Sequence, residues 1–329
     1  MMTALEGEWK YRGMQGTRKE AVTRVIIGDE AAGQRLDNYL FRQLKGVPKS
    51  RIYRMLRGGE ARVNGRRAEP SQRLESGDEV RIPPVRTAQL ASSSPARVTR
   101  SLLKHVLYRD DALLALDKPA GQAVHGGSGV SLGIIEQLRL EMPDTPYMEL
   151  VHRLDKETSG VLLVALKRSA LTTMHRMLRE GQVRKTYTAL ARGQWRGEQR
   201  HVRLSLQKYV TAEGERRVAV SDHGQYAHTV FRLIRQYPGY SLLEAELKTG
   251  RTHQIRVHLA ALGHPIAGDE KYGDYELNRR LKKQGLKRMF LHAQRLVFAH
   301  PLTGVPLDLA SPLPGDLDDF LHGMEHDGG

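Results

Sequence analysis

Apolar residues recur with helical spacing in two consecutive segments near the N-terminus. In residues 34–44 they stand at i, i+3, i+4 and i+8, which predicts a helix with one core-facing side. After Pro48 the apolar residues again share one side of a helix, while the opposite side is cationic. Its cations include Arg51, Arg54 and Arg57. We therefore expect the second helix to pack with one face and to present positive charge on the other.

A hairpin and a further strand are predicted after these helices. Residues 61–67 are expected to turn at Asn64 and Gly65, because both residue types tolerate positive φ. A second turn at 76–78 precedes a strand over 79–82, and residues 21–27 are compatible with a short extra strand. Residues 86–100 lack periodicity and are rich in serine and alanine, which is typical of a linker between domains.

From about residue 105 onward, the chain shows strand-like and helix-like segments without a regular strand–helix–strand alternation. Strands are predicted at 106–108, 113–116, 148–151, 161–166, 185–191, 202–206, 229–234 and 242–247. Helices are predicted at 131–142 and 169–180, and another is expected to begin within 250–263. This order indicates an α+β domain.

The first candidate for chemistry is a charged loop, residues 152–160, held between two apolar strands. Loops set on rigid strands commonly carry catalytic groups. Within this loop Asp155 is flanked by Arg153 and Lys156, and nearby cations favour an ionised carboxylate. The alternative is a turn whose aspartate and serine only hydrogen-bond the backbone. Composition alone favours that alternative.

The second candidate is the segment 250–259, which is predicted to start a helix with a buried apolar stripe. The stripe consists of Ile255, Leu259 and Leu262. Arg256 lies at its edge, where a semi-buried guanidinium needs a carboxylate partner. Zinc is not expected, because His253 and His258 would be rotated by about 140° around a helix.

The third candidate is the strand-like segment 184–190, in which alternation places Lys185, Tyr187 and Ala189 on one face. Tyrosine in a strand is ordinarily a packing residue. The pattern alone therefore assigns Tyr187 no chemical role.

The overall composition favours a polyanionic partner. The 329 residues include 52 Lys and Arg against 37 Asp and Glu, which gives a formal charge of +15 and a pI near 10.0. RNA, DNA and acidic membranes all fit this charge. The longest strongly apolar run, 161–166, is far shorter than the roughly 20 residues that span a bilayer. Residues 1–13 have no signal-peptide pattern, so we expect a cytoplasmic protein that does not enter the membrane.

Cysteine is absent from the chain. Disulfides, thiolate catalysis and cysteine-based zinc sites are therefore excluded. An oxidising and a reducing compartment fit this composition equally well, so it does not indicate a location.

Residues 34–86 resemble the S4 RNA-binding domain in the order of their elements and in four short motifs. The motifs are Gln34-Arg35-Leu36-Asp37, Ser50-Arg51, Val63-Asn64-Gly65 and Gly77-Asp78-Glu79-Val80. The resemblance implies RNA contacts from exposed polar and cationic residues of this domain. These residues are Lys49, Ser50, Arg51, Arg54, Arg57 and Asn64. The alternative is that the arginines form only a solvated helix face.

Residues from about 105 to 310 resemble the RluA-type pseudouridine synthases. Several motifs in the same order carry this resemblance, which makes it more specific than any single motif. They include Asp117-Lys118-Pro119-Ala120-Gly121, His152-Arg153-Leu154-Asp155, Lys185-Thr186-Tyr187, Gly250-Arg251-Thr252-His253-Gln254-Ile255-Arg256, Gly268-Asp269 and Leu291-His292-Ala293. The resemblance implies an α+β catalytic domain with mixed, largely antiparallel sheets flanked by helices.

The same resemblance implies an isomerase that converts specific uridines to pseudouridine in large-subunit (23S) ribosomal RNA. It assigns Asp155 as the catalytic carboxylate, Arg256 as its ion-pair partner and Tyr187 as the ring that stacks on the uracil. Arg153 would fill the gap left by the flipped nucleotide. No metal or other cofactor is implied, and the protein is expected to bind ribosomal RNA as a monomer. Whether Asp155 attacks C1′ or removes a proton from C2′ stays open.

Together these features predict four segments. They are an N-terminal extension over 1–33, an S4-like domain over 34–86, a linker over 87–104 and a catalytic domain over 105–329. Two other classes of function remain: a non-catalytic S4-type rRNA-binding or ribosome-assembly protein, and a glycosylase that releases the free base. The joint presence of Asp155, Tyr187 and Arg256 argues against the first, and an assay for released uracil distinguishes the second.

Overall fold

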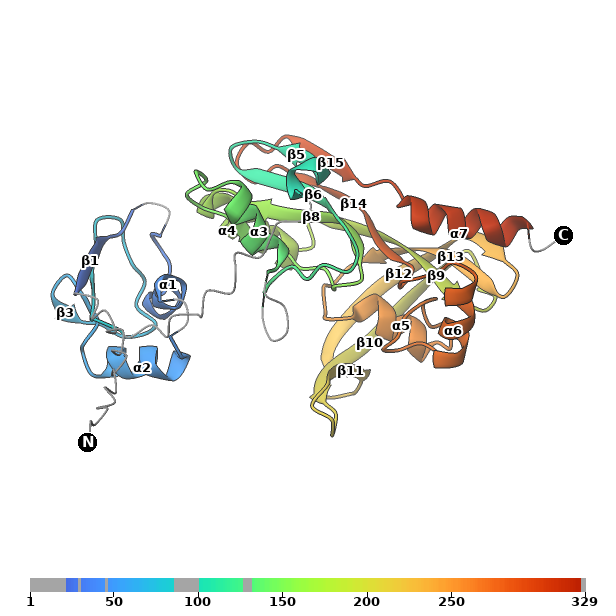
Figure 1. The fold of residues 1–329 in the computed structure, drawn as a ribbon, viewed down its shortest axis with the longest axis horizontal. Helices are drawn as coiled ribbons and strands as arrows, with labels where there is room; N and C mark the ends of the chain where they lie inside the picture. Colours follow the sequence, from blue (N-terminus) through green and yellow to red (C-terminus); the bar gives the residue numbers. More distant parts are fainter. Residues whose placement is uncertain (1–21, 29–30, 45–46, 86–100, 127–131, 327–329) are drawn as a thin grey trace, which may run out of the picture. The chain divides into compact units, whose positions relative to one another are not determined.

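The computed structural model describes residues 22–28, 31–44, 47–85, 101–126 and 132–326 (Figure 1). The expectations for residues 1–21, for most of the linker and for the first residue of the helix predicted at 131–142 lie outside these ranges. The chain divides into two compact units, Met1–Pro95 and Ala96–Gly329. Among the described residues, no helix combines the length and the apolar character needed to cross a bilayer.

The N-terminal unit packs two helices against a small antiparallel sheet. Its elements are β1 (Thr23–Ile26), α1 (Leu36–Gln43), α2 (Lys49–Arg57), β2 (Arg62–Val63), β3 (Arg66–Arg67) and β4 (Glu79–Ile82), with the strands in the order β1-β4-β2-β3. Leu36 and Leu40 of α1 pack with Ile52 and Met55 of α2 in one buried core. The predicted helices, hairpin and last strand are thus confirmed. Strand β1, which precedes the expected start of the domain, pairs with β4 in the same sheet.

The hairpin between β2 and β3 turns where the sequence predicts it. Asn64 and Gly65 both have positive φ, 50° and 73°, as a two-residue hairpin turn of this kind requires. The Asn64 side chain also fastens the turn to the next strand: its amide nitrogen donates to Asp78 at 2.7 Å and its oxygen accepts the Glu79 N–H at 2.8 Å. Asn64 therefore has a structural role in this unit.

The larger unit is built on an 11-stranded sheet. Its strands are β5 (Val106–Arg109), β6 (Leu113–Lys118), β7 (Glu149–Leu150), β8 (Ser159–Ala165), β9 (Arg184–Arg192), β10 (Gln199–Val210), β11 (Arg216–Val220), β12 (Gln225–Tyr237), β13 (Tyr240–Leu247), β14 (Leu291–Ala299) and β15 (Pro306–Ala310). The main path runs β11-β10-β12-β13-β9-β14-β8-β6-β5, with β15 paired to β14 and β7 to β8. All pairs are antiparallel except β14–β8, so the expected mixed, largely antiparallel sheet is confirmed.

Helices flank this sheet on both sides. They are the short 3₁₀ helix η1 (Leu102–His105), α3 (Ile134–Glu141), α4 (Arg168–Arg179), α5 (Gln254–Ala261), α6 (Tyr275–Lys283) and α7 (Gly315–His326). Every residue of β8 is buried, and its side chains alternate between two hydrophobic clusters. Val161 and Leu163 pack with Met174 of α4, whereas Leu162 and Val164 belong to the cluster that contains residues of α3, α5 and α7. This two-sided burial explains why β8 has a continuous apolar run in the sequence.

Strand β14 joins the two halves of the sheet, because it runs parallel to β8 and antiparallel to β9. The β8–β14 crossing is so close that a Cβ on Gly160 would lie 2.2 Å from the Ala293 carbonyl oxygen, and the φ of Gly160 is 107°. Only glycine fits this position. The loop before Gly160 is therefore held against the centre of the sheet.

Candidate active site

Asp155 lies in the loop that joins β7 to β8. The Thr158 N–H donates to the Asp155 carbonyl at 3.1 Å, and the Gly121 N–H donates to the Lys156 carbonyl at 2.8 Å. The Asp155 side chain is 20% exposed. The backbone of the loop is thus fixed while the carboxylate keeps access to solvent and to a ligand.

Two further side chains fasten this loop to the sheet. Lys118 is fully buried, and its Nζ donates to three backbone carbonyls at 2.8 to 3.0 Å, one of which belongs to Lys156. His152 accepts the Leu163 N–H on Nε2 at 3.1 Å, which requires that nitrogen to be unprotonated. Burial lowers the pKa of Lys118 to about 7, and loss of solvent around the ring lowers that of His152 to about 4. Both residues therefore stabilise the conformation of the loop, and neither has a role in the reaction.

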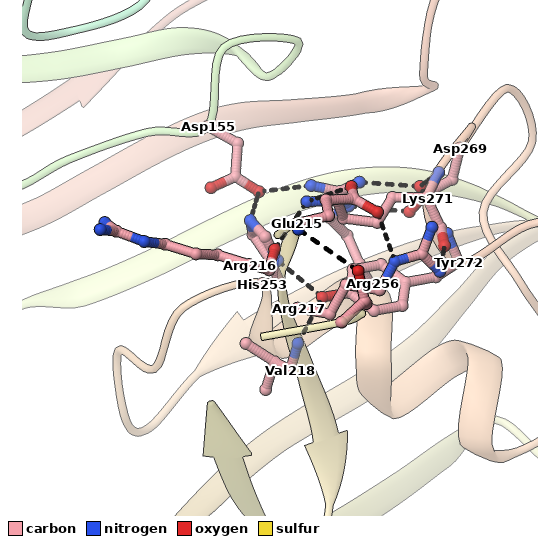
Figure 2. A network of polar contacts seen from close by, with 11 residues as sticks. Asp155, Glu215, Arg216, Arg217, Val218, His253, Arg256, Asp269, Lys271 and Tyr272 are labelled. Atoms are coloured by element: carbon pink, nitrogen blue, oxygen red, sulfur yellow. Dashed lines mark hydrogen bonds and ion pairs between the residues drawn. The ribbon is translucent and has the colours of Figure 1, made fainter. Parts of the chain in front are cut away.

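Arg256 of α5 forms the expected ion pair with Asp155. Its Nη1 lies 2.9 Å from Asp155 Oδ2, and the arginine side chain is only 11% exposed (Figure 2). A largely buried charged hydrogen bond of this length holds the carboxylate in one orientation. The structure therefore brings together two residues that are far apart in the sequence.

Asp269 is a site residue for which sequence analysis assigned no role. Arg256 donates to it through Nε and Nη2, both at 2.8 Å, so the guanidinium is shared between two carboxylates (Figure 2). Burial alone would raise the pKa of Asp269, but the hydrogen bonds and charge of Arg256 keep this pKa below its usual value. The Gly268-Asp269 motif was the available signal, but the sequence alone does not show which side chain it faces.

His253 and Tyr272 contact each other next to the Asp155–Arg256 pair. The His253 Nδ1 and the Tyr272 hydroxyl are 2.7 Å apart, and the Arg256 guanidinium lies 5.1 Å from the Tyr272 ring centre. Contrary to the expectation that His253 and His258 share a helix, His253 precedes α5 with a φ of 54°. The spacing argument against zinc therefore does not apply to this pair. In the ranges that the structure describes, no group of three or more His, Asp or Glu residues is arranged to hold a metal ion.

Asp155, Tyr187 and Arg256 line one cavity of about 610 Å³. Pockets for small ligands commonly measure about 300–1,000 Å³. Among the described residues that line this cavity, Asp155 is the only acidic one, and several are cations. These cations are Arg153, Arg179, Lys185, Lys248, Arg251 and Arg256. A cavity with one carboxylate among six cations suits an anionic ligand, such as one that carries phosphate.

Tyr187 is presented to the cavity by β9, and its side chain is largely buried. Burial raises the pKa of Tyr187 above its usual value, and the negative charge of Asp155 adds to this shift. The residue is therefore a neutral phenol at physiological pH. Such a ring can both stack on a base and hold a proton.

Comparison with known proteins identifies the family. A model described as RNA pseudouridylate synthase matches residues 112–261, and an S4 domain model matches residues 34–80. A protein of Salmonella typhi named ribosomal large subunit pseudouridine synthase C is 50% identical over 310 residues, covering 93% of this chain and 97% of the relative. The chain belongs to the RNA pseudouridylate synthase family.

Other relatives of this synthase support the same family assignment. Proteins of the same printed name are 50% identical in Escherichia coli (strain K12), over 94% of this chain and 99% of the relative, and 48% identical in Pasteurella multocida (strain Pm70), over 92% and 94%. Among solved structures, the human RNA pseudouridylate synthase domain containing 4 protein is 28% identical with a TM-score of 0.56, covering 68% of this chain and 94% of that one. The predicted fold class and family are confirmed.

The S4 unit of the synthase presents several of its cations on α2. Arg54 and Arg57 are exposed, as are Lys49 and Ser50. Arg51 instead donates to both carboxylate oxygens of Glu60, at 3.2 and 3.0 Å. Arg54 and Arg57 are therefore the arginines of this helix face that are more available to phosphate.

Changing Arg54 and Arg57 to Glu is expected to weaken RNA binding and to flatten its salt dependence. Each lost phosphate contact reduces the slope of log affinity against log salt by about 0.7 to 0.9. The slope should be measured by filter binding. A matched variant with Lys104→Glu and Arg109→Glu, which alters two exposed cations of the other unit, should keep the wild-type slope. Equal slopes in all three proteins would contradict RNA binding by this helix face.

Proposed function

We propose that this synthase isomerises uridine to pseudouridine in large-subunit ribosomal RNA, with Asp155 as the catalytic carboxylate. The observation that carries the proposal is the Arg256–Asp155 pair at 2.9 Å in a cationic cavity that also contains Tyr187. We further propose that the protein acts in the cytoplasm, as a monomer and without a cofactor.

The reaction needs one carboxylate rather than two. Hydrolysis of a glycosidic bond usually requires one acidic group to protonate the leaving group and another to activate water. In the isomerisation, the C1′–N1 bond breaks, the uracil turns and a C1′–C5 bond forms, while the proton at C5 is lost and N1 gains one. No water is consumed and no electrons are exchanged. Asp155 assists the first step, either as a nucleophile at C1′ or as a base at C2′.

Three surrounding side chains have the other roles in the proposed reaction. Arg256 holds the Asp155 carboxylate in one orientation, because Asp269 fixes the guanidinium through two other donors. Tyr187 stacks on the uracil and exchanges a proton late in the reaction. Arg153, which is exposed and lines the cavity, fills the space left in the RNA by the flipped nucleotide.

Large-subunit ribosomal RNA is proposed as the substrate on two grounds. Relatives of 48–50% identity over more than 90% of the chain carry this substrate in their printed names. An S4 domain and a net charge of +15 supply the affinity for a structured polyanion.

The purified protein should therefore form pseudouridine in protein-free large-subunit ribosomal RNA and leave small-subunit ribosomal RNA unmodified. Pseudouridine is mapped in both RNAs after incubation, and free uracil is measured in the same samples. Release of uracil would indicate a glycosylase. Tight binding of the RNA with neither product would indicate a non-catalytic rRNA-binding protein.

Tyr187→Phe is expected to retain RNA affinity and to lose most of its turnover. The ring of phenylalanine still stacks, but the hydroxyl that exchanges the proton is gone. Tyr187→Ala should impair both properties, because base stacking contributes about 1 to 3 kcal/mol per base. Single-turnover conversion and binding affinity should be measured for both variants. Normal turnover with weakened binding in Tyr187→Phe would contradict this division of roles.

A further inference from the structure

Helix α6 and the turn after it carry a dense positive charge that the proposed chemistry does not use. The segment from Tyr275 to Arg288 contains six Lys and Arg and a single acidic residue, Glu276. Only Leu281 of α6 is buried. The helix was not predicted from the sequence, because one buried and one half-buried leucine give it a weak apolar pattern.

One side of α6 combines an aromatic ring with cations. Tyr275, Arg279 and Lys282 stand at i, i+4 and i+7, which places them along one stripe, and Lys283 lies beside it. Tyr275 is 76% exposed. Arg279 pairs with Glu276 at 3.2 Å, but both side chains are more than 60% exposed, so the pair is weak and open to exchange with phosphate. An exposed aromatic ring among cations is the surface that single-stranded nucleic acid prefers.

A half-buried residue of α6, Asn278, fastens the helix to the active site. Asn278 accepts the Gly268 N–H at 3.0 Å and donates to the Asp269 carbonyl at 2.8 Å. Asp269 is the residue that holds Arg256, which in turn holds Asp155 (Figure 2). A nucleotide bound to the exposed side of α6 therefore lies on a helix that directly supports the catalytic pair.

A second cavity, of about 510 Å³, is lined both by Arg256 and by residues of α6. Arg256 lines this cavity and the first one, and Lys282 of α6 and Lys287 also line the second. The acidic residues in the lining of the second cavity are Glu157, Glu215, Asp269 and Glu270. Because these carboxylates repel phosphate, we expect the backbone to follow the rim and the exposed stripe of α6 rather than the cavity floor.

We propose that the exposed side of α6 is a second RNA-binding surface, which holds the single-stranded RNA next to the target uridine. Arg279, Lys282 and Lys283 bind its phosphates, and Tyr275 stacks on one of its bases. This inference rests on the proposed function in taking RNA as the substrate. The test of this inference measures RNA binding alone. The α6 proposal can therefore fail while pseudouridine formation is observed, and α6 can bind RNA in a protein that forms no pseudouridine.

The phosphate contacts are tested with the full chain and a fluorescein-labelled oligouridylate. Combining Arg279→Gln, Lys282→Gln and Lys283→Gln should lower the slope of log affinity against log salt by about 2, since each contact with a single strand contributes about 0.7. The control combines Lys104→Gln, Arg109→Gln and Lys167→Gln, which removes three exposed cations outside the linings of both cavities. The control should keep the wild-type slope.

Two outcomes would overturn the proposal: an unchanged slope in the α6 variant, or an equal loss of slope in the control. If the α6 variant melts at a lower temperature than the wild type, Lys282→Gln alone decides the question, with an expected decrease of about 0.7 in the slope of log affinity against log salt.

The stacking role of Tyr275 is tested with an oligouridylate that contains 2-aminopurine, whose fluorescence falls on stacking. The wild type and Tyr275→Phe should quench it, and Tyr275→Ala should not; quenching by all three would reject the stacking role.

Discussion

Asp155→Asn is expected to lower single-turnover pseudouridine formation by several orders of magnitude while the protein stays folded and continues to bind RNA. An amide can serve neither as the nucleophile at C1′ nor as the base at C2′, and each tenfold loss of rate corresponds to about 1.4 kcal/mol in the barrier. RNA affinity should persist, because it rests on a distributed cationic surface rather than on one acid.

The structure also predicts how stable this variant is. Replacing Asp155 takes one of two carboxylates from Arg256, but Asp269 still holds the guanidinium through Nε and Nη2. No buried charge is left unpaired, so the thermal melt should change little. The measurement combines single-turnover conversion, a filter-binding curve and a melt on the same preparation. Near-normal conversion by folded Asp155→Asn protein would refute the proposed role of this residue.

Asp269→Asn is expected to damage both stability and activity, although Asp269 is not proposed to touch the substrate. One carboxylate oxygen accepts three N–H groups, from Arg256, Lys271 and Tyr272, and the other accepts the Arg256 Nε–H. An amide has one donor in place of an acceptor, so either orientation sets N–H against N–H. Breaking a buried ion pair from one side costs about 3 to 5 kcal/mol. Loss of this support should also misplace Arg256 and with it Asp155.

Asp316→Asn is the matched control for this prediction. Asp316 accepts from Arg288 in the same two-oxygen arrangement, at 2.7 and 3.2 Å, but its side chain is 57% exposed. The Arg288 side chain is 10% exposed, so this pair is partly open to solvent, and we expect it to contribute less than the more deeply buried Asp269–Arg256 pair. Chemical denaturation should separate the two variants clearly, and activity should be measured at a temperature where both are folded. Equal unfolding free energies for Asp269→Asn and Asp316→Asn would show that the buried pair does not support the site.

Local residue patterns predicted most of the helices and strands of both units. The apolar run of β8, the amphipathic α1, α2 and α4, and the Asn64-Gly65 turn were all recognisable, because each depends on neighbours within a few residues. Strands β11, β14 and β15 and helices α6 and α7 were not predicted. The residue pattern of β14, for example, does not reveal its place between β8 and β9, because that place depends on strands more than a hundred residues away.

For the site itself, the sequence determined the chemical groups: a single charged loop with Asp155, a semi-buried arginine that needs a carboxylate, and a strand tyrosine. The tertiary structure decided their arrangement. Only the fold shows that Arg256 is shared between Asp155 and Asp269, that Arg51 is held by Glu60, and that α6 supports the catalytic pair. The reason is physical: composition and spacing specify which charges must be buried or exposed, whereas the partner of each charge depends on which distant segments the hydrophobic core brings together.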